Sequence, residues 1–105
     1  MNAPKFQLQK EITEDTNTLY LIGDLDLSQA TEMRNIINPL VAESERNLVI
    51  NMQDLNYIDS TGIGVILSIL KARDVQKAPL RIESIPPKIK RLFDITGLTP
   101  FLTSV

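Results

Sequence analysis

One internal segment of the sequence passes from an apolar strand into a helix: Leu55-Asn56-Tyr57-Ile58-Asp59-Ser60-Thr61-Gly62-Ile63-Gly64-Val65-Ile66-Leu67. We expect its helix to run from Thr61 to about Asp74, with Ser60 as an N-cap whose hydroxyl accepts a hydrogen bond from a first-turn N–H. Gly62 and Gly64 fall inside this helix, where each costs about 1 kcal/mol relative to alanine. We therefore expect another group to approach the helix backbone closely at these positions.

The predicted helix has two apolar faces when its residues are placed at about 100° per position. Each face contains four residues, which are Ile63, Ile66, Leu67 and Leu70 on the first and Gly62, Val65, Ile69 and Ala72 on the second. A helix that packs on a sheet buries one such face. The second face must therefore be covered by a neighbouring helix or be left for a partner.

The rest of the chain predicts a hairpin followed by alternating helices and strands. The predicted elements are strands at 6–12 and 19–22, a kinked helix at 28–44, a strand at 48–52, the helix at 61–74, a strand at 80–85 and a helix at 86–97. Ser28 is the predicted N-cap of the first helix, Pro39 its kink, and Gly97 the stop of the last helix. Four side chains of the last helix are expected to face the core, namely Ile89, Leu92, Phe93 and Ile95.

These elements predict a single α/β domain that spans residues 1–105. Strands that are separated by helices need crossover connections, so most of the sheet should be parallel. The predicted architecture is a mixed, mostly parallel sheet of four or five strands that is covered by helices.

The composition excludes several classes of covalent, metal-binding and catalytic site. The chain has no Cys and no His, which excludes disulfides, thiolate metal sites, cysteine nucleophiles and Ser-His-Asp triads. Its 11 basic and 13 acidic side chains give a net charge of −2, without the basic excess that is typical of nucleic-acid-binding surfaces. The longest apolar run, residues 63–70, is far shorter than the ~20 residues that cross a bilayer, and the N-terminus lacks a signal peptide. We therefore expect a cytoplasmic protein that binds neither nucleic acid nor membrane.

Three segments make the sequence recognisable, and they follow the order found in one family. Residues 59–67 resemble the phosphorylation motif of bacterial anti-sigma factor antagonists, which are small STAS-domain proteins. Residues 23–26, Gly-Asp-Leu-Asp, are similar to an acidic motif at a strand end in that family, in which Glu usually replaces Asp24. Residues 90–98, Lys-Arg-Leu-Phe-Asp-Ile-Thr-Gly-Leu, are similar to its C-terminal helix. The likeness covers nearly the whole chain.

The resemblance implies a regulatory binding protein and no enzyme. The unphosphorylated form would bind an anti-sigma factor that is also a serine kinase, and would thereby release a sigma factor to transcription. The kinase would phosphorylate Ser60 with its own ATP and Mg²⁺, and a PP2C-type phosphatase would reset the switch, so the protein itself needs no cofactor. Thr61 stays open as an alternative phosphorylation site, because its hydroxyl follows directly. The alternative function is that of a scaffold subunit in a larger sensory assembly, because the same fold serves there too.

The residues that we expect to contact the partner lie in or beside the first two of these motifs. They are Asp24, Asp26, Ser28, Asp59, Ser60, Thr61, Gly62, Ile63, Gly64 and Val65. None is expected to be catalytic or to bind a metal. A phosphate on Ser60 would add about −1.5 to −2 charges beside the apolar face that includes Val65. Burying this charge unpaired would cost several kcal/mol, which predicts more than a hundredfold loss of affinity with little change in fold.

Three other interpretations of the motifs fit less well. Residues 59–62 place their Gly one position later than the Asp-Thr-Gly of aspartic proteases, and a helix follows. Residues 23–28 are similar to the nucleophile loop of haloacid-dehalogenase phosphatases, which needs Mg²⁺ and a Lys far along a longer chain. Residues 62–64 lack the third Gly of a dinucleotide-binding loop. Asp24 and Asp26 also have a purely structural interpretation, as solvated strand-end residues that cap a helix.

Overall fold

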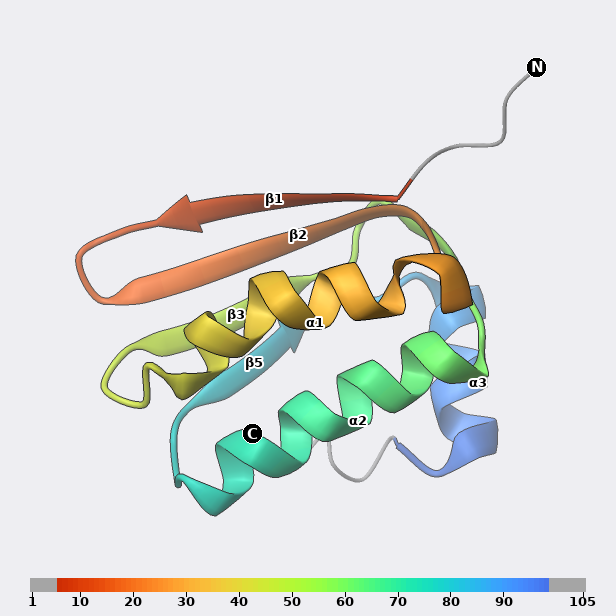
Figure 1. The fold of residues 1–105 in the computed structure, drawn as a ribbon. Coiled ribbons are helices and arrows are strands. Elements are labelled where there is room, and N and C mark those ends of the chain that lie inside the picture. Colours follow the sequence, from red (N-terminus) through yellow and green to blue (C-terminus); the bar gives the residue numbers. More distant parts are fainter. Residues whose placement is uncertain (1–5, 99–105) are drawn as a thin grey trace.

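The computed structural model describes residues 6–98, and the predicted domain boundaries at residues 1 and 105 lie outside this range. The chain forms, in order, β1 (Gln7–Ile12), β2 (Thr16–Leu25), α1 (Leu27–Ala42), β3 (Asn47–Asn51), β4 (Leu55–Ile58), α2 (Ser60–Val75), β5 (Leu80–Glu83) and α3 (Pro87–Thr96) (Figure 1). Each predicted helix and strand is present. The strand end predicted before Asp59 is β4, the fourth strand along the chain and one of five in the sheet.

The sheet is mixed and mostly parallel, as predicted. β1 and β2 form an antiparallel hairpin, whereas β2–β3, β2–β4 and β3–β5 are parallel pairs. β2 pairs with β3 along its first half and with β4 at its end, and the register shifts between Gly23 and Asp24. Gly23 has a φ of 91°, a left-handed conformation that glycine adopts without steric cost. This glycine therefore lets one strand pair with two successive partners.

All three helices share one core with the sheet. α1 and α2 lie side by side on one face, and α3 lies at the end where α2 begins (Figure 1). Every second residue of β2 is buried, as expected for a strand with one covered face. The largest completely buried apolar side chains are Leu19, Leu21, Leu25, Met33, Ile37, Leu48, Ile50, Met52, Leu55, Ile66 and Phe93.

The second apolar face of α2 is covered by α1. Val65 and Ile69 are 1% and 4% exposed, and they lie beside Ile37 and Val41 of α1. Of the two possibilities that the sequence left open, a neighbouring helix and not a partner therefore covers this face. A partner has no access to Val65 or Ile69 while the two helices stay packed.

The first two helices begin slightly earlier than predicted, each after an aspartate. Asp26 is the N-cap of α1 in place of Ser28, and Asp59 is the N-cap of α2 in place of Ser60. Aspartate and serine cap helices about equally well, so residue type alone does not distinguish them. The prediction that α1 continues past Pro39 is confirmed.

The last helix follows its prediction with one exception. Gly97 ends α3 in the left-handed conformation, with a φ of 81°. Ile89 and Phe93 are buried and Leu92 is half-buried. The prediction that Ile95 faces the core is wrong, because this side chain lies on the far side of α3 and is 73% exposed.

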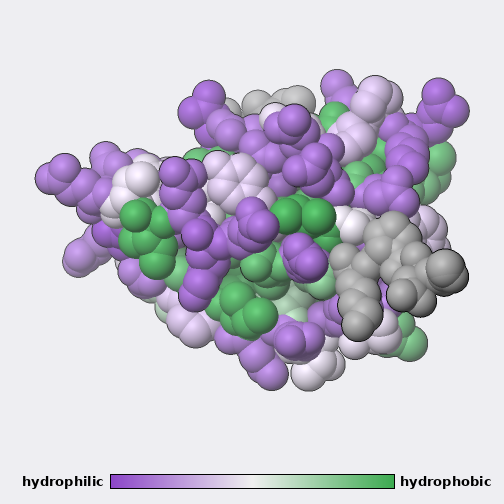
Figure 2. Space-filling model, turned by 90° about the horizontal axis from the view of Figure 1, so that it is seen from above, coloured by the Kyte–Doolittle hydropathy of each residue, from purple (hydrophilic) through white to green (hydrophobic). Residues whose placement is uncertain are grey.

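The free edge of the sheet at β1 is mostly polar, and Ile12 at its end is the exposed apolar residue of the strand. Gln7, Gln9, Lys10 and Glu11 are all exposed along this strand. Figure 2 looks onto this side of the molecule, where polar side chains predominate and separate the apolar areas. Such an edge discourages pairing with a strand of another chain. Within residues 6–98, no helix combines the length and apolar character needed to cross a bilayer.

Candidate functional site

The carboxyl ends of β2 and β4 and the N-terminal ends of α1 and α2 meet at one end of the molecule (Figure 1). Leu25 and Ile58, the last residues of the two strands, are paired with each other, and one residue separates each strand from its helix. In open α/β sheets, the carboxyl ends of parallel strands are the usual place for a binding site. We call this region, residues 24–28 and 56–64, the Ser60 end.

Asp59 holds the first turns of both helices. Its Oδ1 accepts a hydrogen bond of 2.9 Å from the backbone N–H of Gly62, which caps α2. Its Oδ2 accepts one of 3.0 Å from the backbone N–H of Leu27, the first residue of α1. One carboxylate thus joins two segments that are 32 positions apart in the sequence. Because both oxygens are bound inside the protein, Asp59 acts at this end as a positioning residue.

Asp26 and Ser28 form a local cap at the start of α1. The backbone N–H and the hydroxyl of Ser28 both donate to Oδ1 of Asp26, at 2.9 and 2.6 Å. Ser28 is exposed, and its hydroxyl is oriented by this contact. The two residues predicted as site residues are therefore brought together, as a capping pair at the rim of the Ser60 end.

Asp24 connects the Ser60 end to α3 through two hydrogen bonds. Its Oδ1 accepts a bond of 3.1 Å from Nδ2 of Asn56 on β4. Oδ1 of Asn56 in turn accepts a bond of 3.2 Å from Nζ of Lys88 on α3. The helix that contains the third sequence motif therefore lies next to the elements that contain the other two.

Ser60 is presented to solvent at the first position of α2. Its side chain is exposed, and its hydroxyl has no hydrogen-bond partner among residues 6–98. Thr61, the neighbouring hydroxyl, is half-buried. The first N–H groups of a helix lack partners within the helix, and the positive end of the helix dipole lies there. An anion on the Ser60 oxygen would therefore meet a favourable local field.

Gly62 and Gly64 have different surroundings. A Cβ at Gly62 would lie 2.7 Å from Cγ1 of Ile58 and 3.0 Å from the backbone oxygen of Leu25. The close packing of α2 on β2 and β4 therefore accounts for this glycine. A Cβ at Gly64 would meet nothing within 4 Å. The predicted close approach is thus internal at Gly62, while the fold itself gives no steric reason for Gly64.

Two further predicted contact residues belong to the core. Ile63 and Val65 are both buried, because α2 lies against the sheet on one side and against α1 on the other. The prediction that a partner contacts their side chains does not fit this burial. The accessible residues of the predicted set are Asp24, Asp26, Ser28, Asp59, Ser60, Thr61 and Gly64.

Two apolar side chains at the Ser60 end were missed by sequence reasoning. Leu27 is 71% exposed and Tyr57 is 50% exposed. Together with Asp26, Ser28 and Asp59 they line a shallow hollow. Large apolar or aromatic side chains such as these are expected inside a domain. The alternation along β4 gave no signal either, because Leu55 and Ile58 are both buried while Tyr57, which is in phase with Leu55, is exposed.

The family model described as "STAS domain" matches residues 7–104 of the chain. The chain belongs to the STAS domain family. The resemblance carried by the three sequence motifs is thereby confirmed.

Relatives of this STAS domain have names that describe regulation. The "Anti-sigma-B factor antagonist" of Staphylococcus aureus is 34% identical over 76 residues, which are 72% of this chain and 70% of the relative. An anti-sigma factor antagonist from Mycobacterium paratuberculosis has a TM-score of 0.82 at 20% identity, over 95% of this chain and 86% of that one.

The antagonist SpoIIAA has also been solved. Its unphosphorylated form has a TM-score of 0.74 at 23% identity, over 92% of this chain and 84% of that one. Its phosphorylated form, described as a Bacillus cell fate determinant, has a TM-score of 0.71 at 23% identity, over 92% and 87%. At these identities the solved structures show the shared STAS fold alone. The name of the curated relative describes a regulatory binding protein, which confirms that this STAS domain is not an enzyme.

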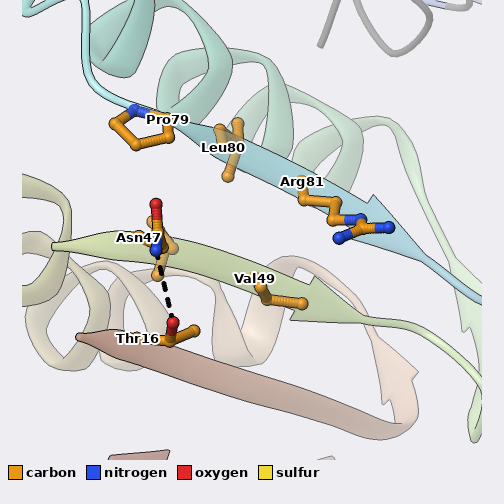
Figure 3. Close-up of a pocket in the computed structure, with 7 residues that line it drawn as sticks. Thr16, Asn47, Val49, Pro79, Leu80 and Arg81 are labelled. Atoms are coloured by element: carbon orange, nitrogen blue, oxygen red, sulfur yellow. Dashed lines mark hydrogen bonds between the residues drawn. The ribbon is translucent and has the colours of Figure 1, made fainter. Parts of the chain in front are cut away.

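Another hollow lies at the opposite end of the STAS domain, where β2, β3 and β5 begin (Figure 3). Its volume is about 460 Å³, and Thr16, Asn47, Leu48, Val49, Pro79, Leu80 and Arg81 line it. Nδ2 of Asn47 donates to Oγ1 of Thr16 at 3.4 Å, and the Arg81 guanidinium lies 3.5 Å from the Glu83 carboxylate. No residue predicted from the sequence as a site residue lies there. Within residues 6–98, no group of three His, Cys, Asp or Glu side chains is arranged to hold a metal ion.

Proposed function

We propose that this protein is an anti-sigma factor antagonist that is switched by phosphorylation of Ser60. In its unphosphorylated form it binds an anti-sigma factor that is also a serine kinase, and the sigma factor is released. The observation that carries this proposal is the exposed Ser60 at the start of α2, where the first two sequence motifs lie side by side. Membership in the STAS family and the name of the curated Staphylococcus aureus relative support it.

The exposure of the two hydroxyls favours Ser60 over Thr61 as the target. A kinase must place the attacking oxygen in line with the γ-phosphate, so the side chain has to be accessible. Ser60 is exposed and its hydroxyl is unbonded within residues 6–98, whereas Thr61 is half-buried. The structure of SpoIIAA in a phosphorylated form is a precedent within the same fold.

A phosphate on Ser60 fits the local structure of this protein. It would stand at the N-terminus of α2, where free N–H groups and the helix dipole favour an anion. The carboxylate of Asp59, one residue before, would oppose it through like-charge repulsion. The two effects partly cancel, so we expect the fold to persist when Ser60 is phosphorylated.

The switch acts on the partner and not on the fold. A phosphate carries about −1.5 to −2 charges and a strongly held hydration shell. An interface that covers Ser60 would have to remove that shell, which costs several kcal/mol and lowers affinity more than a hundredfold. The kinase partner would supply ATP and Mg²⁺, and a PP2C-type phosphatase would restore the free hydroxyl. Both reactions would take place in the cytoplasm, where sigma factors act.

The experiment compares Ser60→Ala, Ser60→Asp and Thr61→Val with the wild type. We measure the affinity for the purified anti-sigma factor of the same organism by titration calorimetry, and the fold by circular dichroism. We expect Ser60→Asp to weaken binding at least about tenfold with an unchanged spectrum, and Ser60→Ala and Thr61→Val to bind like the wild type. Incubation with the kinase and ATP should add one phosphoryl group to the wild type and to Thr61→Val, and none to Ser60→Ala, by intact-mass spectrometry.

Two outcomes would contradict the proposal. A wild-type protein that binds no anti-sigma factor and instead assembles into large particles would favour the scaffold function. A loss of binding in Ser60→Asp that occurs only together with a collapsed spectrum would refute the idea that the phosphate blocks the interface locally.

A further inference from the structure

Six large apolar side chains are exposed within residues 6–98, and two of them stand together. They are Ile12, Leu27, Ile36, Tyr57, Val75 and Ile95. Leu27 and Tyr57 line the same hollow, which Asp59 also borders, one residue before Ser60. The other four line no part of this hollow.

The backbone holds Leu27 in its exposed position. Leu27 is the first residue of α1, and its N–H donates to Oδ2 of Asp59 at 3.0 Å. Asp26, directly before it, is fixed as the N-cap by its contact with Ser28. The side chain therefore projects from a segment that is tied on both sides, so little conformational freedom of the backbone is lost when a partner covers it.

Tyr57 is held by the sheet. It lies in β4, where its backbone pairs with that of Asp24 on β2, and its neighbour Ile58 points into the core. An aromatic ring that is half exposed on a fixed strand is typical of residues that dominate binding energy in protein interfaces. Two apolar groups from separate elements thus border one hollow.

The rim of the hollow is negatively charged. Asp26 and Asp59 line it, and Asp24 is the backbone partner of Tyr57. The nearest cation in the hydrogen-bond network, Lys88, donates to Asn56 and does not line the hollow. The complementary occupant therefore presents an apolar side chain next to an arginine or lysine.

We infer that Leu27 and Tyr57, rimmed by Asp26 and Asp59, form the apolar anchor that docks the anti-sigma factor beside Ser60. This inference rests on the proposed function, and it replaces the buried face of Val65 and Ile69 as the apolar part of the interface. The anchor takes an apolar side chain of the anti-sigma factor, and the acidic rim takes a neighbouring basic one. A phosphate on Ser60 competes with the acidic rim for that basic group. The hydrated phosphate then holds the basic group away from the anchor.

The test uses substitutions at the anchor and matched substitutions elsewhere. Leu27→Ala and Tyr57→Thr remove the apolar groups, while Val75→Ala and Ile95→Ala remove apolar groups outside the hollow that are more exposed than either. We expect each anchor variant to weaken binding of the same anti-sigma factor by about tenfold or more, and each control to stay within about twofold of the wild type. Thermal unfolding of all four variants identifies any loss of binding that is due to unfolding.

A charge variant tests the rim independently. Asp26→Ser keeps a residue that caps helices well but removes the negative charge. We expect weaker binding and a smaller dependence of the affinity on salt concentration than for the wild type. A salt dependence that is unchanged would overturn the proposed basic group in the partner.

The outcomes separate this inference from the proposed function. If Ser60→Asp weakens binding while Leu27→Ala and Tyr57→Thr bind like the wild type, the anchor is refuted and the proposed function stands. If the wild type binds no anti-sigma factor, both fail together. If the wild type self-associates in sedimentation analysis and Leu27→Ala does not, the hollow binds a second copy of this chain, and the inference is wrong.

Discussion

The two ends of this STAS domain use their charged residues in opposite ways. At the Ser60 end the carboxylates of Asp24, Asp26 and Asp59 bind backbone and side-chain donors close to solvent. At the opposite end Arg73 is 1% exposed, and its guanidinium donates to four backbone carbonyls, those of Val41, Glu43, Arg46 and Pro79, at 2.6–3.2 Å. We call this region the Arg73 end.

A second arginine, Arg46, also donates hydrogen bonds to backbone carbonyls at the Arg73 end. Nε of Arg46 donates to Oδ1 of Asn17 at 3.2 Å, and its Nη atoms donate to the carbonyls of Thr13, Glu14 and Thr16 in the β1–β2 turn. Burial lowers the pKa of Arg73, yet an arginine keeps its charge in proteins. At the Arg73 end, buried or half-buried arginines fix the β1–β2, α1–β3 and α2–β5 connections. The Ser60 end is tied instead by the Asp59 carboxylate, and it also carries exposed, modifiable groups.

The largest expected effect comes from removing the buried guanidinium. Arg73→Ala would leave the four carbonyls without these donors, and we expect the free energy of unfolding to fall by about 3 kcal/mol. Urea unfolding followed by circular dichroism measures this change. Arg73→Lys, which keeps the charge but has fewer donors, should lose less.

The same variants test whether the two ends are independent. In buffer where Arg73→Lys is fully folded, its affinity for the anti-sigma factor should equal that of the wild type. An affinity that falls in proportion to the stability would show that the Arg73 end and the Ser60 end are coupled.

The two glycines of α2 offer the next contrast. Gly62→Ala forces a Cβ against Ile58 and the Leu25 carbonyl. The cost of this overpacking exceeds the gain in helix propensity, so we expect the free energy of unfolding to fall by about 1–2 kcal/mol. Gly64→Ala places its Cβ in open space and should raise the free energy of unfolding by about 1 kcal/mol. Paired thermal and urea unfolding curves check the direction of the stability change in both variants. A destabilised Gly64→Ala would mean that the surface of α2 is less open than its geometry indicates.

A smaller effect is expected from the carboxylate that joins the two helix starts. Asp59→Ser can still cap α2 but cannot also accept from the N–H of Leu27, so we expect a loss of about 1 kcal/mol. Amide hydrogen exchange, read by NMR, should show faster exchange at Leu27 and little change at Gly62. Equal acceleration at both amides would argue against separate roles for the two carboxylate oxygens.

The smallest effect should come from the exposed link to α3. Lys88→Ala removes the donor to Asn56 in a solvent-exposed contact, and we expect the free energy of unfolding to change by less than about 0.5 kcal/mol. A thermal shift in high and low salt measures it. A large loss would show that this exposed link, like the buried Arg73, contributes substantially to the stability of the fold.

The sequence predicted the architecture well because its signals were regular. The alternation of helices and strands predicted the parallel crossovers, and Gly97 marked the end of α3. The caps were misplaced by one or two residues, since Asp26 and Ser28, or Asp59 and Ser60, are equivalent by residue type and differ only in backbone geometry.

The remaining features of the site depend on contacts between residues that are far apart in the chain, and a single sequence does not reveal such contacts. The covering of Val65 by α1 follows from the packing of two helices, which a helical wheel cannot supply. Arg73 looks like an ordinary surface cation. Its burial requires four carbonyls, which come from the end of α1 and from the α1–β3 and α2–β5 connections. The exposure of Leu27 and Tyr57 contradicts hydropathy, and such local conflicts often mark functional surfaces.

The pairing of β2 with three strands has a consequence for how the chain reaches its native state. The β1–β2 hairpin joins neighbours in sequence, whereas Thr16 pairs with Asn47, Gly23 with Leu55, and Leu48 with Leu80. Each of these parallel pairs closes a loop of about thirty residues, so the loop-closure entropies are nearly equal. Chain length therefore gives none of the crossovers an advantage in folding. The hairpin offers the only local template in the described part of the sheet. β3 and β4 dock on its strand β2, whereas β5 docks on β3.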